Sequence, residues 1–143
     1  VNERQKMIVY DKLRALIGDV QGKTIALWGL AFKPETDDMR EAPALVVIDR
    51  LLCEGAKIKV FDPIAMEECQ RRIGDVVVYA KDMYDAVVDA DALILLTEWK
   101  QFRMPSWAVM RKAMKSPVLV DGRNIYDKAE VLTEGFRYSA IGK

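Results

Sequence analysis

The chain has 143 residues, 51% of them hydrophobic, and its 22 basic and 22 acidic residues give a net charge of zero. This length suits one domain with a substantial core. Without a basic surplus, nucleic-acid binding is not expected, and no apolar stretch is long enough for a membrane span. The first residues also lack the pattern of a signal peptide.

The chain contains no histidine and two cysteines, Cys53 and Cys69. Histidine is the commonest general base and a frequent metal ligand, so we expect neither a complete catalytic site nor a metal centre here. Neither cysteine has a base or a cationic niche beside it, which argues against an activated thiol. We therefore expect both to be small, reduced core residues of a cytoplasmic protein.

Segments of helical and strand character alternate along most of the chain. The spacing of apolar residues predicts helices at 3–17, 42–54, 65–73, 83–88 and 106–114. Short apolar runs predict strands at 24–30, 57–61, 76–79, 92–97, 118–120 and 136–140. Gly55 and Gly74 suit helix ends, and Ser106 suits an N-cap. The alternation predicts an α/β fold, a Rossmann-like doubly wound, mostly parallel sheet of about six strands, preceded by a connector helix.

The loop after the first predicted strand carries the strongest functional signal. Residues 29–41 have the sequence Gly-Leu-Ala-Phe-Lys-Pro-Glu-Thr-Asp-Asp-Met-Arg-Glu. Ligands of open α/β sheets bind beyond the carboxyl ends of the strands, where helix N-termini favour anions. Pro34 stiffens the chain beside Lys33, so less freedom is lost when that lysine binds phosphate. Lys33 and Arg40 are therefore candidate phosphate ligands, although each side chain can also simply be solvated or ion-paired.

The same loop lacks the dinucleotide fingerprint Gly-x-Gly-x-x-Gly, of which only the first glycine, Gly29, is present. The second glycine lets the backbone approach a pyrophosphate and the third allows tight helix packing. We therefore do not expect this sheet to hold NAD at its first turn. Asp62 stands where such sheets place a ribose-binding acid, but Asp-Pro is also a common turn, and the turn is the preferred interpretation.

Two later loops carry further candidates at strand ends. Glu98 and Trp99, with Phe102 nearby, follow the fourth predicted strand, where they can line a base or sugar pocket or simply pack against the sheet. Asp121-Gly-Arg-Asn follows the fifth strand, where the glycine permits a tight backbone. Arg123 can then reach the crevice of Lys33, or it can be a solvated turn residue. Two cationic loops at one sheet edge indicate phosphate better than either does alone.

With these motifs in their observed order, the chain resembles the C-terminal, UDP-binding domain of the UDP-glucose/GDP-mannose dehydrogenase family. The likeness covers 20–143, and 1–19 resembles the end of the helix that joins this domain to the family's central domain. The long first motif is specific, and the short ones gain weight from their order and spacing. The shared segments are 29–41, Phe61-Asp-Pro63, Thr97-Glu-Trp99 with Phe102, Asp121-Gly-Arg123 and Tyr138-Ser-Ala-Ile-Gly-Lys143.

The resemblance implies a division of labour. Family enzymes oxidise a nucleotide sugar's C6 alcohol to a carboxylate in two NAD-dependent steps, through covalent intermediates on a cysteine of the central domain. NAD is bound mainly by an N-terminal domain, and the full-length enzyme is expected to be a homodimer. Phe32, Lys33 and Arg123 match residues that contact the UDP-sugar substrate, and Arg40 matches a residue that reaches toward NAD. No catalytic residue is expected in this chain.

Other interpretations remain open at this point. The chain could be a stand-alone nucleotide- or phosphate-binding regulatory module, or a structural oligomerisation domain that uses its first helix. The sugar nucleotide is also open, because UDP-glucose, UDP-N-acetyl-mannosamine and GDP-mannose enzymes share this layout. A phosphoacceptor domain of the receiver type is disfavoured, because Asp37 and Asp38 lie well beyond the strand end and Arg40 follows closely.

Overall fold

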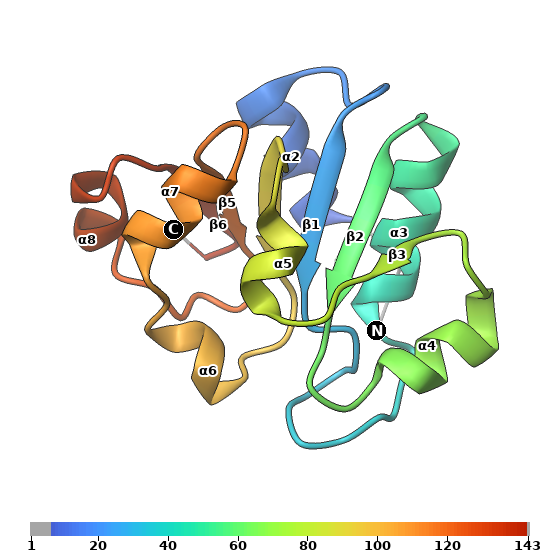
Figure 1. Cartoon of the computed structure of the whole chain (residues 1–143). Helices are drawn as coiled ribbons and strands as arrows, with labels where there is room; N and C mark the ends of the chain where they lie inside the picture. Colours follow the sequence, from blue (N-terminus) through green and yellow to red (C-terminus); the bar gives the residue numbers. More distant parts are fainter. Residues whose placement is uncertain (1–6, 143) are drawn as a thin grey trace.

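The strands of the computed structural model, which describes residues 7–142, form one sheet in which every neighbouring pair is parallel. In order across the sheet they are β3 (Val78–Tyr79), β2 (Lys57–Phe61), β1 (Thr24–Trp28), β4 (Ala92–Leu95), β5 (Val118–Asp121) and β6 (Arg137–Ala140) (Figure 1). This order, 3-2-1-4-5-6, is that of a doubly wound Rossmann sheet. The predicted fold class is confirmed.

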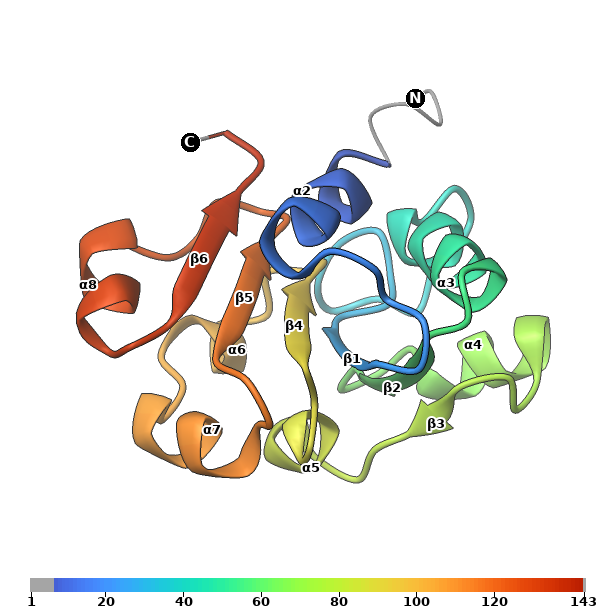
Figure 2. The same cartoon turned by 90° about the horizontal axis from the view of Figure 1, so that it is seen from above.

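Helices cover both faces of the sheet (Figure 2). On one face lie α2 (Ile8–Ile17), α3 (Pro43–Cys53) and α4 (Met66–Ile73). The core on the other face includes side chains of α5 (Met83–Val87), α6 (Lys100–Arg103), α7 (Trp107–Ala113) and α8 (Lys128–Thr133). The sequence predicts the five-residue α5 but not α6 and α8, which have four and six residues. Segments this short give little helical period to detect.

The predicted boundaries are mostly accurate, with informative exceptions. The predicted strands 24–30 and 92–97 each end two residues early in the structure. For β1 the cause is Gly29, whose φ of +95° leaves the extended region. Ser106 caps α7 as predicted, because its hydroxyl accepts a hydrogen bond from the Val109 amide. The part of the predicted helix 3–17 that precedes residue 7 lies outside the described residues.

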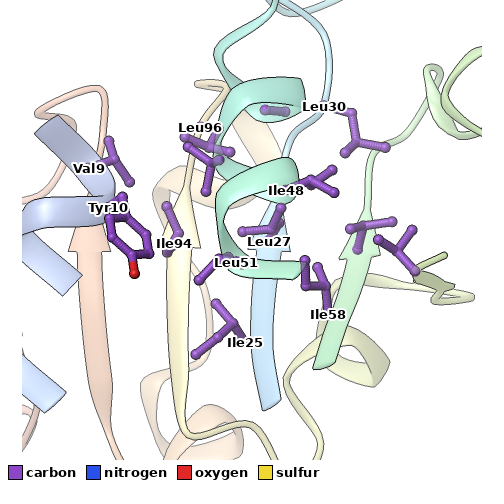
Figure 3. Packing of buried hydrophobic residues seen from close by; sticks show 14 of the residues in the cluster. Val9, Tyr10, Ile25, Leu27, Leu30, Ile48, Leu51, Ile58, Ile94 and Leu96 are labelled. Carbon is purple, nitrogen blue, oxygen red and sulfur yellow. The ribbon is translucent and has the colours of Figure 1, made fainter. Parts of the chain in front are cut away.

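Central strands contribute side chains to both cores, as expected for a sheet covered on both faces. In β1, Ile25 and Leu27 join the core under α2 and α3, while Ala26 and Trp28 join the opposite core. Figure 3 shows the first of these cores. In the second, the Trp28 ring stacks on Phe102 with 4.9 Å between centroids. Phe102 is therefore a packing residue rather than part of a ligand pocket.

The first helix, α2, packs directly on the sheet. Tyr10 and Leu13 are buried in the same core as β1 and β4, and Figure 3 shows Tyr10 there. The last carbonyl of the helix also has a partner, because Lys23 Nζ donates to the Ile17 carbonyl oxygen at 3.0 Å. A cation suits this end of a helix, where the dipole is negative. The helix expected to be a connector therefore shares the core of the sheet.

The two cysteines differ in environment. Cys69 is buried, and this burial raises the pKa of its thiol, which disfavours the reactive thiolate. Cys53 is exposed, so the prediction that it is a core residue is wrong. The buried stripe of α3 runs through Val47, Ile48 and Leu51, and Cys53 lies outside that stripe.

Among the described residues, no helix has the length and apolar character needed to span a bilayer.

Candidate functional site at the carboxyl edge of the sheet

Loops that carry the candidate residues leave the sheet at the carboxyl ends of its strands. The chain runs from β1 to β2 on one side and from β4 to β5 on the other, so β1 and β4 flank the switch point where ligands bind in such sheets. Three polar or charged residues are buried in the described part of the chain, namely Asp62, Thr97 and Asp121. All three lie at or just beyond strand ends at this edge, and each holds a loop in place.

Asp62, directly after β2, joins two loops through its fully buried carboxylate. Its Oδ2 accepts hydrogen bonds from the amides of Leu30 and Ala31, at 2.8 and 3.4 Å, in the loop after β1. Its Oδ1 accepts from the amides of Ile64 and Ala65, both at 2.8 Å, just before α4. The turn predicted at this position is present, and Asp62 also bonds to the first turn of the sheet.

Thr97, two residues beyond β4, holds the loop after β1 from the other side. Its Oγ1 donates to the Ala31 carbonyl oxygen at 2.7 Å. The loop after β1 and the segment after β4 approach each other very closely here. A Cβ placed on Gly29 would lie 2.4 Å from the Thr97 side chain. Gly29 is required both by this approach and by its positive φ. The loops after β1 and β4 are thus fixed to each other.

Asp121 ends β5 and organises the loop that contains Arg123. Its carboxylate accepts from the amides of Arg123, Ile125 and Tyr126 at 2.9 to 3.0 Å. The Tyr138 hydroxyl in β6 also donates to Asp121 Oδ2 at 2.9 Å. Burial is the main cause that raises the pKa of Tyr138, and the hydrogen bond to Asp121 raises it further, so the hydroxyl keeps its proton. The loop after β5 is a tight turn around one buried anion.

Phe32 and Lys33 are presented by a loop that folds back on itself. The Phe32 amide donates to the Asp38 carbonyl oxygen at 3.2 Å. The Met39 side chain is buried in the core and anchors the second half of the loop. Phe32 is 42% exposed, and Lys33 is exposed. Lys33 has no ion-pair partner among the described residues. Two consecutive residues, the apolar Phe32 and the unpaired cation Lys33, are therefore both exposed to solvent.

Arg40 lies before α3, which begins at Pro43, so it is not in the first turn of that helix. Its guanidinium binds Asp38 in a bidentate manner, with both N–O distances at 3.0 Å. Hydrogen bonds from Arg40 lower the pKa of Asp38 to about 2. A hollow of about 340 Å³ lies beside this pair; it is lined by Asp37, Asp38, Met39, Arg40, Glu68 and Arg72.

Arg123 is paired, in contrast to Lys33. Its Nη2 donates to Glu98 Oε2 at 2.9 Å, and both side chains are about three-quarters buried. Glu98 Oε1 and the indole nitrogen of Trp99 are buried without a hydrogen-bond partner among the described residues. Burial works against ionisation of Glu98, but the Arg123 hydrogen bond and charge, with a backbone hydrogen bond, outweigh it and lower the pKa of Glu98.

The contacts bring the predicted loops to one stretch of the edge. Ala31, two residues before Lys33, is bonded to Thr97, and the next residue along, Glu98, is bonded to Arg123. The loops that carry Lys33 and Arg123 therefore both contact the same short segment after β4. Sequence reasoning did not find the roles of Thr97 and Asp121. The available signal was a polar residue at the end of a predicted apolar strand, as for Thr97, or directly after one, as for Asp121.

The first turn of this sheet does not fit a dinucleotide. Dinucleotide-binding sheets hold a pyrophosphate on first-turn amides, with glycines that let the backbone come close. Here the amides of Leu30 and Ala31 already bind the buried Asp62 carboxylate. In addition, no group of three or more His, Cys, Asp or Glu side chains within residues 7–142 is arranged to hold a metal ion.

Comparison with known proteins gives consistent matches. Residues 26–128 match the profile of the UDP-glucose/GDP-mannose dehydrogenase family, UDP binding domain. UDP-glucose 6-dehydrogenase of Pseudomonas aeruginosa is 47% identical over 99% of this chain and 33% of the relative, and UDP-glucose 6-dehydrogenase TuaD of Bacillus subtilis is 41% identical over 99% and 31%. The solved UDP-glucose dehydrogenase from Pyrobaculum islandicum matches with a TM-score of 0.83 and 31% identity, over 98% of this chain and 30% of that one. The chain thus spans about a third of these relatives.

Proposed function

Because the chain belongs to the UDP-glucose/GDP-mannose dehydrogenase family, we propose that it is the nucleotide-binding domain of a UDP-glucose 6-dehydrogenase. The whole enzyme oxidises the C6 alcohol of UDP-glucose to a carboxylate, with NAD as hydride acceptor. The identity of 41–47% to UDP-glucose 6-dehydrogenases supports UDP-glucose over other sugar nucleotides. The arrangement of cationic loops around the switch point supports a phosphate-containing ligand.

In this proposal Lys33 and Arg123 neutralise the diphosphate of UDP-glucose, and Phe32 packs against the nucleotide sugar. The observation that carries the proposal is the bonded path from Ala31 through Thr97 and Glu98 to Arg123. It holds the two cationic loops in contact with one segment. Charge-assisted hydrogen bonds to phosphate are strong, and they need donors that are held in position beforehand.

NAD lies mainly on other domains of the enzyme in this proposal, because the first turn here is filled by Asp62. Arg40, which is exposed on the loop before α3, faces the cofactor from this domain. Residues 1–19 connect to a central domain, and 20–143 form the nucleotide-binding unit of a homodimeric enzyme. Catalytic residues lie outside the chain, so the chain on its own is inactive.

Calorimetric titrations of the chain with UDP and with uridine test the proposal. We expect UDP to bind and uridine to bind far more weakly, because the cations recognise the diphosphate. Lys33→Ala should weaken binding of UDP but not of uridine. Equal affinity for the two ligands would contradict a diphosphate site, and NADH production from UDP-glucose by the chain alone would contradict the division of labour.

A further inference from the structure

The Asp62 carboxylate occupies an unusual position for a charged group. It is fully buried, and four backbone amides from two different loops point at it. Two of these amides belong to the first turn of the sheet, and two lie just before α4. Amides of a first turn are the groups that hold phosphate in Rossmann sheets. Asp62 therefore supplies, from within the chain, an anion of the kind such a turn attracts.

The same carboxylate determines where the ligand-bearing loop begins. Ala31 is held at both of its polar backbone groups, since its amide donates to Asp62 and its carbonyl accepts from Thr97. The neighbouring Leu30 amide donates to Asp62 as well. Phe32 and Lys33 follow directly. The backbone that leads to these two exposed side chains is thus fixed from β2 and from β4 together.

We propose that Asp62 is a positioning residue that sets the place of Phe32 and Lys33, and that it closes the first turn of the sheet to phosphate. The phosphates of the ligand are consequently held by side chains of the loops and not by first-turn amides. This inference rests on the proposed function for the identity of the ligand. The closure of the first turn by an internal anion can be tested separately.

Asp62→Ala in the full-length enzyme tests both parts. Loss of the carboxylate frees the loop, so we expect KM for UDP-glucose to rise about tenfold or more while kcat changes far less. The substitution leaves space for one small carboxylate beside four amides. Formate, compared with chloride at equal ionic strength, should therefore lower the KM of Asp62→Ala and raise its melting temperature.

Two further variants provide controls. Asp62→Asn keeps the size of the side chain but turns an NH₂ group toward amide donors, so its KM should rise without any response to formate. Asp82→Asn changes an exposed aspartate that caps α5 and accepts from the Asp85 amide at 2.7 Å. This variant should keep the KM of the wild type.

The outcomes separate the two proposals. An unchanged KM in both Asp62 variants, or a fall in kcat alone, would overturn the positioning role. A formate response of Asp62→Ala no larger than that of the wild type would overturn the closure of the first turn. Failure of the wild-type enzyme to use UDP-glucose would contradict the proposed function instead, and the formate-dependent melting temperature would still test the buried anion.

Discussion

Two sides of the carboxyl edge solve the same problem in different ways. On the β1–β2 side, Asp62 divides its hydrogen bonds between two separate loops. On the β4–β5 side, Asp121 bonds within its own loop and to the Tyr138 hydroxyl of β6. The first arrangement fixes one loop relative to another, and the second makes a single loop rigid. A buried carboxylate surrounded by backbone amides thus serves two kinds of positioning.

The cations on the two sides also differ. Lys33 is exposed and has no ion-pair partner among residues 7–142, whereas Arg123 is largely buried and paired with Glu98. A phosphate that binds Lys33 displaces only water. A phosphate that binds Arg123 must share the guanidinium with a carboxylate that is already in place. The two cations are therefore expected to contribute differently to binding and to stability.

The largest effect is expected from Asp121→Ala. Three amides and a hydroxyl lose their common acceptor in a buried site, so the free energy of unfolding should fall by roughly 3–5 kcal/mol. Asp127→Ala is a matched control, because this exposed aspartate caps α8 through one bond to the Glu130 amide. Its cost should be about 1 kcal/mol. Chemical denaturation measures both, and equal losses would contradict the role given to Asp121.

Three glycines allow the next comparison of the two sides. Alanine at Gly29 meets both a positive φ and the Thr97 side chain at 2.4 Å, so we expect a loss of about 2–4 kcal/mol. Gly122→Ala meets the Leu95 carbonyl oxygen at 2.6 Å and the Val9 side chain at 3.1 Å, but its φ is not positive. Gly18→Ala meets only an unfavourable φ in open space. Each should cost less than Gly29→Ala in denaturant unfolding. A smaller loss at Gly29 than at Gly18 would show that the β1 and β4 loops are not tightly joined.

The fold could be predicted largely because apolar periodicity is local. Continuous apolar runs mark the central strands β1, β4 and β5, which are buried on both faces. Strand ends were less accurate, because the chain leaves the sheet at Gly29 for reasons of φ and close packing that an apolar run does not encode. The exposed position of Cys53 depends on which face of α3 meets the sheet.

The sequence predicts the cations of the candidate site but not the residues that hold their loops in place. Lys33 and Arg123 are recognisable because both follow predicted strands and are charged. The residues that hold their loops are harder to find, because their partners are remote: Thr97 bonds to a carbonyl 66 residues earlier, and Asp62 to amides 31 and 32 residues earlier. Which remote residues meet depends on the order of the strands in the sheet, and the apolar pattern of the sequence does not determine that order.

Lys33→Ala and Arg123→Ala should separate the two cations. In the full-length enzyme each should raise KM for UDP-glucose about tenfold to 100-fold, because a charge-assisted hydrogen bond to phosphate is lost. Only Arg123→Ala should also lower the unfolding free energy, because it leaves Glu98 without its cation. Lys57→Ala, at the amino end of β2, is the exposed control and should change neither quantity. Equal destabilisation by both variants would remove the contrast between paired and unpaired cations.

The smallest effect concerns the acid dependence of the Arg123–Glu98 pair. Because the pKa of Glu98 is lower in the folded protein than its ordinary value of 4.5, its ionised form contributes stability above that value. This contribution, roughly 1 kcal/mol or less, is lost as the pH falls through the lowered pKa. The gap in unfolding free energy between wild type and Glu98→Gln should therefore be constant near neutral pH and narrow in acid, whereas the gap for Lys33→Ala should not change with pH in that range. A Glu98→Gln gap that widens in acid would mean that burial, and not Arg123, dominates the ionisation of Glu98.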